Sequence, residues 1–328
     1  MSRIYFATNR NSNRANTGFG SKFNPDGMAC LRFGWADKRG SKIKVRVADE
    51  DLVANEQGTA EDPQRCTYGS LEIFSEMRKL MIDEGSDALI FIHGYNNSFR
   101  DSLRSGFKLA AQFPSLKILV FSWPSDGSMA PWLAYASDRN DAAASGPALA
   151  RGLLKLTDFL CQQNPDECQS KVHLLAHSMG AFVLRHALQY YRQNNPQLHQ
   201  FLAEIALVAA DEDSNAFEVG DKLQALPQIA NRVSVYFNRN DQAMAISDLS
   251  KGNPERLGQS GLQSALLAPA KVSQVDCSQV VTKFPGHDYY KNNSKVIADL
   301  TAVFAGLESS LIEGRRYQID QHRYVIEA

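Results

Sequence analysis

The chain has 328 residues, of which 44% are hydrophobic and 22% are charged, the balance of a globular protein long enough to bury a large core. The 35 Lys and Arg residues against 36 Asp and Glu give a formal net charge of −1, which predicts no general attraction to nucleic acid or to an anionic membrane. We find no secretory signal, no apolar run of about 18 residues and no CxxC pair among five cysteines. These absences predict a cytoplasmic protein without a transmembrane segment.

The N-terminal part predicts two strands separated by a long loop. IYFAT (4–8) and IKVRVA (43–48) have the composition and alternation of strands. The stretch 9–27 between them is rich in Asn, Gly and Ser, which is typical of a loop. Arg10 and Arg14 within it are candidates to bind an anionic substrate group, and the alternative is an ordinary solvated loop.

From residue 88 onward, short apolar runs alternate with helix-length segments. The predicted strands are 88–92, 117–121, 171–175, 204–209, 232–237 and 280–284. The predicted helices are 98–112, 137–161, 178–192, 216–230 and 293–308. Strands this apolar, separated by helices, are typical of a mostly parallel sheet with helices on both faces, so we predict an α/β fold.

We expect one domain in which the N-terminal strands extend the sheet. Residues 1–75 would be the strand and loop extension, 76–310 the catalytic core and 311–328 a C-terminal tail. A second loop-like stretch, 246–278, is rich in Gly and Pro.

The motif Ala176-His177-Ser178-Met179-Gly180 lies between a predicted strand and a predicted helix. A nucleophile elbow turns sharply at this kind of junction and needs small residues two positions before and after the serine. Ala176 replaces the usual first glycine, the mildest departure possible. The motif therefore predicts an α/β-hydrolase fold with Ser178 as the nucleophile at the carboxyl edge of the sheet.

An acyl-transfer site also needs hydrogen-bond donors for the developing oxyanion. The backbone N–H of Met179, at the start of a helix, is one candidate. The second donor should come from the loop after the 88–92 strand, and there we favour the N–H of Tyr95, with the neighbouring His93 stabilising the loop. Trp123 and Trp132 are candidates to line the substrate pocket, although a Trp-Pro at a strand end is often only packing.

A serine hydroxyl needs a base, and the base needs a carboxylate to fix its tautomer. In this fold the chain order is serine, acid, histidine. His287 follows the last predicted strand and precedes the last helix, where the base belongs. Asp241 follows the strand 232–237 and is the favoured acid, with Asp211 as the alternative.

Several motifs, in their order and spacing, resemble those of one known family. They are YFATNR (5–10), FIHGYNNSF (91–99), FSWPSDG (121–127), AHSMG (176–180), AADED (209–213), NRND (238–241), RLG (256–258) and GHDYY (286–290). Together they resemble bacterial α/β-hydrolases long catalogued as a domain of unknown function within the esterase and lipase superfamily. The resemblance covers most of the chain and implies the hydrolase fold with a complete triad, but no substrate.

The expected function is therefore hydrolysis of a small or lipid-like carboxylic ester through a Ser-His-Asp triad and an acyl-enzyme. An acyltransferase, thioesterase or amidase would use the same triad, and a non-catalytic binding module is a third possibility. No metal or organic cofactor is expected, because the triad needs none. We expect no nucleic-acid partner, and the sequence makes no prediction of oligomeric state.

Overall fold

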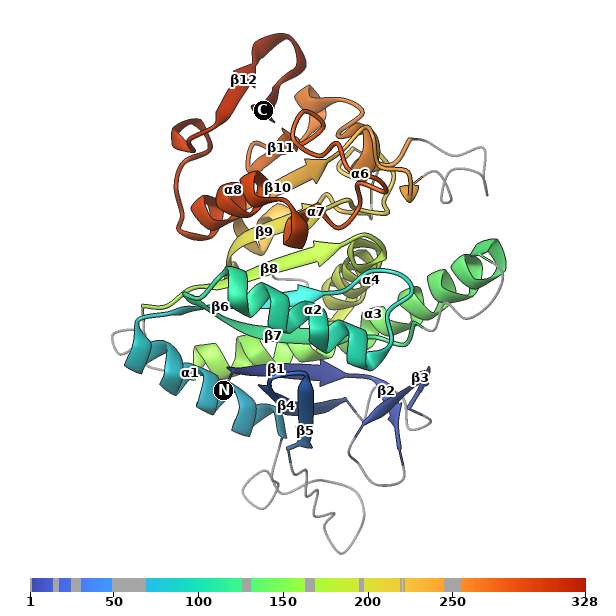
Figure 1. Cartoon of the computed structure of the whole chain (residues 1–328), viewed down its shortest axis with the longest axis vertical. Helices are drawn as coiled ribbons and strands as arrows, with labels where there is room; N and C mark the ends of the chain where they lie inside the picture. The colour runs from blue at the N-terminus through green and yellow to red at the C-terminus, as the bar shows by residue number, and fades with distance from the viewer. Residues whose placement is uncertain are drawn as a thin grey trace, which may run out of the picture.

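The structure is a computed structural model. It describes residues 2–13, 18–24, 31–48, 69–125, 131–162, 169–194, 198–218, 220, 222–244 and 255–328, the side chains of 131–134 excepted. An eleven-stranded sheet runs in the order β12-β13-β11-β10-β9-β8-β6-β7-β1-β4-β5, from the top of Figure 1 to the bottom. Two further strands, β2 (Arg10–Ser12) and β3 (Phe19–Phe23), form a separate hairpin.

The centre of the sheet is made of parallel strands with mostly buried side chains. They are β6 (Asp87–Ile92), β7 (Leu116–Ser122), β8 (Val172–His177), β9 (Leu202–Val208), β10 (Ala230–Phe237) and β11 (Val272–Asp276). Every residue of β8 and β9 is buried, because helices cover both faces of these strands. The parallel arrangement brings the carboxyl ends of all six strands to one edge of the sheet.

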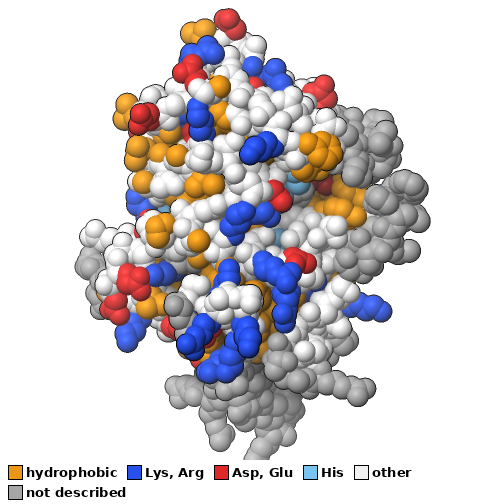
Figure 2. All heavy atoms as spheres, viewed as in Figure 1, with side chains coloured by type: hydrophobic (Ala, Val, Ile, Leu, Met, Phe, Trp, Pro, Cys, Tyr) orange, Lys and Arg blue, Asp and Glu red, His pale blue; other side chains and the backbone are white. Residues whose placement is uncertain are grey.

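The N-terminal strands extend the sheet, as predicted. β1 (Ser2–Thr8) pairs in parallel with β7, whereas β4 (Arg32–Arg39) and β5 (Lys42–Val47) continue it in antiparallel fashion. The exposed side chains of the edge strand β5 are all Lys or Arg. Figure 2 shows Lys and Arg gathered on the lower part of this face, where β4 and β5 lie in Figure 1. Such charges protect an open sheet edge from pairing with other chains.

At the other edge, the segment expected as a C-terminal tail completes the sheet. β13 (Arg323–Ile326) pairs in parallel with β11, and β12 (Arg315–Gln318) pairs antiparallel with β13.

Two hydrophobic cores lie on the two faces of the sheet. One contains residues of α1 (Gly69–Glu84), α3 (Pro131–Cys161) and α4 (Met179–Asn194). The other contains residues of α2 (Phe99–Gln112), α7 (Tyr289–Asn292) and α8 (Ser294–Phe304), with α2 and α8 in front of the sheet in Figure 1. Shorter helical turns are α6 (Leu257–Ser260), η3 (Leu226–Gln228), η4 (Ala265–Leu267), η5 (Ser309–Leu311) and η6 (Ile319–Gln321). This two-sided architecture confirms the predicted fold class.

Two predicted elements are wrong, and two stretches predicted as loops contain strands: β2 and β3 lie within 9–27, and β11 lies within 246–278. The run 280–284 is not a strand, because the N–H groups of Val280 and Val281 turn back to the carbonyl of Cys277. The strand next to β10 is β11, which lies within the stretch expected as a loop. It is polar, yet its Gln274 side chain is satisfied by the N–H of Leu262 and the carbonyl of Gln321, so polarity does not exclude it from the sheet.

The second error is the helix expected over 216–230. Its described residues form turns and the single helical turn η3, in which Pro227 is tolerated only because it stands at the start.

None of the helices in the described ranges is long and apolar enough to cross a membrane.

Candidate active site

Ser178 stands at a sharp turn between β8 and α4. It has a positive φ of 53°, a left-handed conformation that is strained for a residue with a side chain. Its N–H donates to the carbonyl of Val208 at 3.0 Å, and its own carbonyl accepts from the N–H groups of Ala181 and Asp211, also at 3.0 Å. These bonds over-determine the turn, as expected for a nucleophile elbow.

The small residues of the elbow have separate physical reasons. A Cβ on Gly180 would lie 2.5 Å from the carbonyl oxygen of Ile92 and 2.8 Å from that of His93, so only glycine fits there. Ala176, by contrast, points into the core on the α3 and α4 face, where its methyl group is buried among apolar side chains. The departure from glycine at this position therefore leaves the turn intact.

His287, the candidate base, is hydrogen-bonded to Asp241, the candidate acid. The His287 Nδ1 and the Asp241 Oδ2 are 2.7 Å apart, and the Asp241 carboxylate is buried. The other carboxylate oxygen accepts the N–H of Ala243 at 3.0 Å. Because a carboxylate can only accept, the hydrogen bond fixes the tautomer: in a neutral imidazole the proton lies on Nδ1, and Nε2 has the lone pair.

The loops that carry His287 and Asp241 are bonded to each other on both sides of this pair. The Asn238 side chain donates to the carbonyl of Gly286 at 2.8 Å, and the N–H of Gln242 donates to that of Pro285 at 3.0 Å. These contacts fix the position of the His287 imidazole relative to the Asp241 carboxylate.

The alternative acid, Asp211, has other partners. Its carboxylate accepts the Tyr135 hydroxyl at 2.5 Å and the Arg139 guanidinium at 3.3 Å. Asp211 is thus part of a buried network of charged groups beside the elbow. Because the carboxylate bonded to His287 is that of Asp241, the hydrogen bonds favour Asp241 over Asp211 as the candidate acid.

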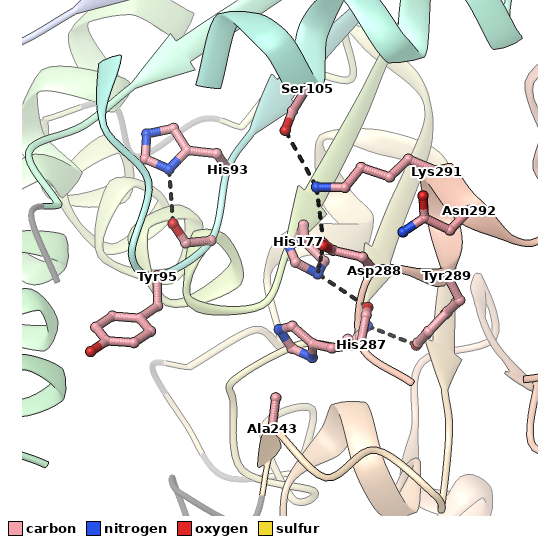
Figure 3. Close-up of polar contacts among 12 residues, drawn as sticks. His93, Tyr95, Ser105, His177, Ala243, His287, Asp288, Tyr289, Lys291 and Asn292 are labelled. Atoms are coloured by element: carbon pink, nitrogen blue, oxygen red, sulfur yellow. Dashed lines mark hydrogen bonds and ion pairs between the residues drawn. The ribbon is translucent and has the colours of Figure 1, made fainter. Parts of the chain in front are cut away.

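His177, which precedes the candidate nucleophile, packs against the candidate base. The rings of His177 and His287 are 4.7 Å apart, and the His177 Nε2–H donates to the carbonyl of His287 at 3.3 Å. Figure 3 shows His177 between His287 and Asp288, with the Lys291 ammonium bonded to the Asp288 carboxylate. Burial, together with the charge of a protonated His287, lowers the pKa of His177 well below its usual range, so His177 stays neutral. Its N–H donor supports the loop that carries His287.

The loop after β6 runs directly past Ser178. A Cβ on Gly94 would lie 2.8 Å from the Cβ of Ser178, so this close approach requires glycine. His93 stabilises the loop as expected, donating from Nδ1 to the carbonyl of Gly94 at 2.8 Å. Burial lowers the pKa of His93 to about 3, which keeps the ring neutral.

Trp123, predicted to line the pocket, is instead fully buried against this loop. Its ring stacks on that of His93 at 5.2 Å, and its indole N–H donates to the carbonyl of His93 at 2.8 Å. This placement favours the packing alternative over a pocket wall. The side chain of Trp132, the second predicted pocket residue, lies outside the described residues.

The two candidate oxyanion donors belong to elements that meet at Ser178. Met179 begins α4, so its N–H is one of the first-turn groups that lack an acceptor within the helix. Tyr95 follows Gly94 on the loop, and its ring contacts that of Tyr135 at 5.9 Å. Their roles as donors stay predictions.

Sequence reasoning missed the place of Arg10. Expected either in a solvated loop or as an anion ligand, it is completely buried and bonded to backbone carbonyls of three separate segments. The alternation of apolar and polar residues gives no sign of a buried guanidinium in an Asn-rich stretch. Arg14 lies outside the described residues.

The model of a protein family described as "Alpha/beta hydrolase of unknown function (DUF900)" matches residues 73–303. The chain belongs to this family. The resemblance predicted from the motifs is thereby confirmed. Among curated proteins, the uncharacterized protein alr1448 of Nostoc sp. (strain PCC 7120) is 32% identical over 128 residues, which cover 31% of this chain and 30% of that relative. The match thus spans less than a third of that relative's length.

Solved structures similar to this family member include Aspergillus fumigatus lipase B, with a TM-score of 0.41, 11% identity, and 67% of this chain and 52% of that chain covered. For an acetylxylan esterase the TM-score is 0.36 and the identity 13%, with 67% of this chain and 97% of that chain covered. For a cutinase-like protein from Cryptococcus sp. the TM-score is 0.33 and the identity 12%, with 67% of this chain and 93% of that chain covered. At these TM-scores the solved structures add no argument to the family match. Among the described residues, no group of three or more His, Cys, Asp or Glu side chains is arranged to hold a metal ion.

Proposed function

We propose that this protein is a serine hydrolase that cleaves carboxylic esters, with Ser178 as nucleophile, His287 as base and Asp241 as acid. The 2.7 Å bond between His287 Nδ1 and the buried Asp241 carboxylate carries the proposal. A buried carboxylate fixes the tautomer that a general base needs and stabilises the imidazolium formed when the base takes a proton. The strained elbow at Ser178 is the second support, since such strain is retained where function requires it.

In the proposed reaction, His287 Nε2 removes the proton of the Ser178 hydroxyl as the oxygen attacks the ester carbonyl. The N–H groups of Met179 and Tyr95 stabilise the resulting oxyanion. His287 then returns the proton to the leaving alcohol, and an acyl-enzyme remains on Ser178. A water molecule, activated by His287 in the same way, releases the carboxylic acid and restores the enzyme.

The proposal is tested by labelling the purified protein with a fluorophosphonate and locating the adduct by mass spectrometry. We expect one adduct, on Ser178, which disappears in Ser178→Ala and forms about 10³-fold more slowly in His287→Ala. Ser234→Ala, which removes a buried serine from β10, and His199→Ala, which removes an exposed histidine, are the matched controls and should label normally.

Hydrolysis of p-nitrophenyl esters of graded chain length is measured in the same variants and should follow the labelling. A folded wild-type protein that is not labelled, or that is labelled at another serine, would contradict the proposal. Labelling without ester turnover would retain the nucleophile and shift the reaction class to transfer, which added alcohol or amine acceptors would reveal.

A further inference from the structure

The Arg10 side chain connects the N-terminal hairpin to the loops at the carboxyl edge of the sheet. Its Nε donates to the Ser122 hydroxyl at 3.0 Å, at the end of β7. One terminal nitrogen donates to the carbonyl of Gly20 in β3 at 3.1 Å and, at 3.4 Å, to that of Ser125. The other donates to the carbonyl of Asn97 at 2.7 Å. One guanidinium therefore joins the N-terminal hairpin to two segments that are distant in sequence, the end of β7 and the loop at Asn97.

Asn97 connects Arg10 to the loop beside the nucleophile. Its side-chain amide donates to the carbonyls of Tyr95, at 2.8 Å, and Gly94, at 3.3 Å. Gly94 in turn lies so close to Ser178 that a Cβ on it would be 2.8 Å from the serine Cβ. Arg10 is thus two hydrogen bonds away from the peptide unit whose direction determines where the Tyr95 N–H points.

The segment that presents Arg10 is itself fixed in place. The Thr8 hydroxyl donates to the carbonyl of Ser122 at 2.6 Å, and the Asn9 amide donates to the Ser145 hydroxyl at 3.0 Å. Ser122 also accepts from the Ser102 hydroxyl of α2 at 2.9 Å. The buried polar network is extensive, and in such a network the loss of one donor leaves several acceptors without a partner.

An arginine is required for this arrangement. The guanidinium has five N–H donors in a rigid planar fork and can serve acceptors on several sides, whereas a lysine ammonium donates from a single nitrogen. The charge also acts locally, because it adds to burial in lowering the pKa of His93, and the ring stays neutral.

We propose that Arg10 is a positioning residue that holds the loop 94–97 against Ser178 and so aims the Tyr95 N–H at the oxyanion. This rests on the proposed function. Arg10 does not touch the reacting atoms: it acts on them through Asn97 and the loop. The N-terminal part of the chain, beyond lengthening the sheet, then supports the active site through Arg10 of β2.

The test compares Arg10→Met with Arg3→Met. Arg3 lies in the same N-terminal segment and also makes strong bonds, to Asp37 at 2.8 Å and Glu76 at 2.7 Å, but none to the loop. For Arg10→Met we expect kcat for an ester to fall about 10²-fold with KM changed less than threefold, since one oxyanion donor is worth 10²- to 10³-fold. Arg3→Met should keep both constants within twofold.

Affinity for an alkyl boronic acid separates positioning from general destabilisation. This inhibitor forms a tetrahedral adduct on an activated serine and should bind Arg10→Met at least tenfold more weakly, while the melting temperature reports folding. If Arg10→Met does not fold, Arg10→Lys is measured in the same way and should retain only part of the wild-type kcat. A folded Arg10 variant with wild-type kcat and boronic acid affinity would overturn the proposal.

Hydrogen exchange makes failure of this proposal distinguishable from failure of the proposed function. In Arg10→Met, the amides of residues 94–97 should exchange at least tenfold faster than in wild type, and those of the same loop in Arg3→Met should not. A wild-type protein that no fluorophosphonate labels would refute the serine hydrolase, yet the exchange rates would still tell whether Arg10 holds the loop. If wild type is labelled and active, and the exchange rates of residues 94–97 are unchanged in Arg10→Met, the role of Arg10 is refuted while the proposed function stands.

Discussion

The two ends of the same sheet each carry a histidine–carboxylate pair. At the carboxyl end, His287 Nδ1 and Asp241 Oδ2 are 2.7 Å apart, and at the amino end His173 Nε2 and Asp87 Oδ2 are 3.3 Å apart. His173 packs against Phe304 of α8, and the second oxygen of Asp87 accepts the N–H of Lys171 at 2.7 Å. The amino-end pair thus connects strand starts to each other, whereas the carboxyl-end pair packs against His177, the residue that precedes Ser178.

Backbone strain separates the two ends further. Four described residues other than glycine have a positive φ, and three of them, Asn96, Ser178 and Ala209, follow the carboxyl ends of β6, β8 and β9. Such conformations cost about 1–3 kcal/mol each and persist where the surroundings over-determine them. The comparison teaches that a histidine–carboxylate pair is not sufficient evidence of a site: the strained serine turn beside it is what distinguishes the carboxyl end.

The largest expected effect comes from removing the charge of each carboxylate in turn. Asp241→Asn should lower kcat about 10³- to 10⁴-fold with the fold retained, because an amide can donate to His287 Nδ1 and so favour the wrong tautomer. Asp87→Asn should leave kcat within twofold and lower the free energy of unfolding by about 1 kcal/mol, the value of one hydrogen bond.

Ester hydrolysis rates and urea unfolding of both variants measure this difference. If Asp87→Asn lost as much activity as Asp241→Asn, the two pairs would not differ in kind. Retained activity in Asp241→Asn would move the acid elsewhere, and Asp211→Asn would then be the variant to make.

The next effect is steric and tests how closely the loop approaches the serine. Gly94→Ala places a methyl group 2.8 Å from the Ser178 Cβ and 3.0 Å from His177 Nδ1, so the loop has to move away. We expect kcat to fall about 10²- to 10³-fold through loss of an oxyanion donor. Gly152→Ala is the control: its nearest neighbour would be Leu31 Cδ2 at 3.5 Å, an ordinary contact, and alanine favours the helix. Equal activity of the two variants would show that the loop does not contribute to catalysis.

The sequence predicts the residues at the carboxyl ends of the parallel strands better than it predicts the residues that support them. The strands β6, β8, β9 and β10 are long apolar runs, and the residues at their ends fall together because parallel strands share one edge. Ser178 and Asp241 follow from that placement. His287 was placed after the run 280–284, which is not a strand, and it lies on the connection between β11 and α7.

The supporting residues were harder to predict, because the cause lies in partners far along the chain. Arg10 has the sequence context of a loop residue, and its acceptors at Asn97 and Ser122 lie far along the chain. β11 likewise has the composition of a loop, although its Gln274 is paired. Local composition reports which residues prefer water, and it does not report which polar groups are satisfied once buried.

The smallest effect on activity, and a test of stability, concerns Glu212. Its carboxylate is fully buried next to the carboxyl edge, with one oxygen 3.4 Å from the Arg185 guanidinium and the other without a partner among the described residues. Burial raises the pKa of Glu212 to about 7, against the attraction of Arg185 and Arg139, with Asp211 and Asp213 adding repulsion. At the amino end, the comparable Glu204 accepts from Arg232 at 2.7 Å.

The sign of the pH dependence follows from the raised pKa. Below pH 4.5 Glu212 is protonated in the folded and unfolded states alike, and its contribution to stability is complete. Between pH 4.5 and about 7 only the unfolded state releases the proton, so the free energy of unfolding falls, by up to about 3 kcal/mol.

Glu212→Gln cannot ionise and should match wild type at pH 4.5, exceed its stability at pH 8, and hydrolyse esters at the wild-type rate. Urea unfolding across this range, with the exposed Glu72→Gln as control, measures the difference. A variant less stable than wild type at pH 8 would mean that Glu212 and Arg185 form a stabilising ion pair, and the carboxyl end would then be as well paired as the amino end.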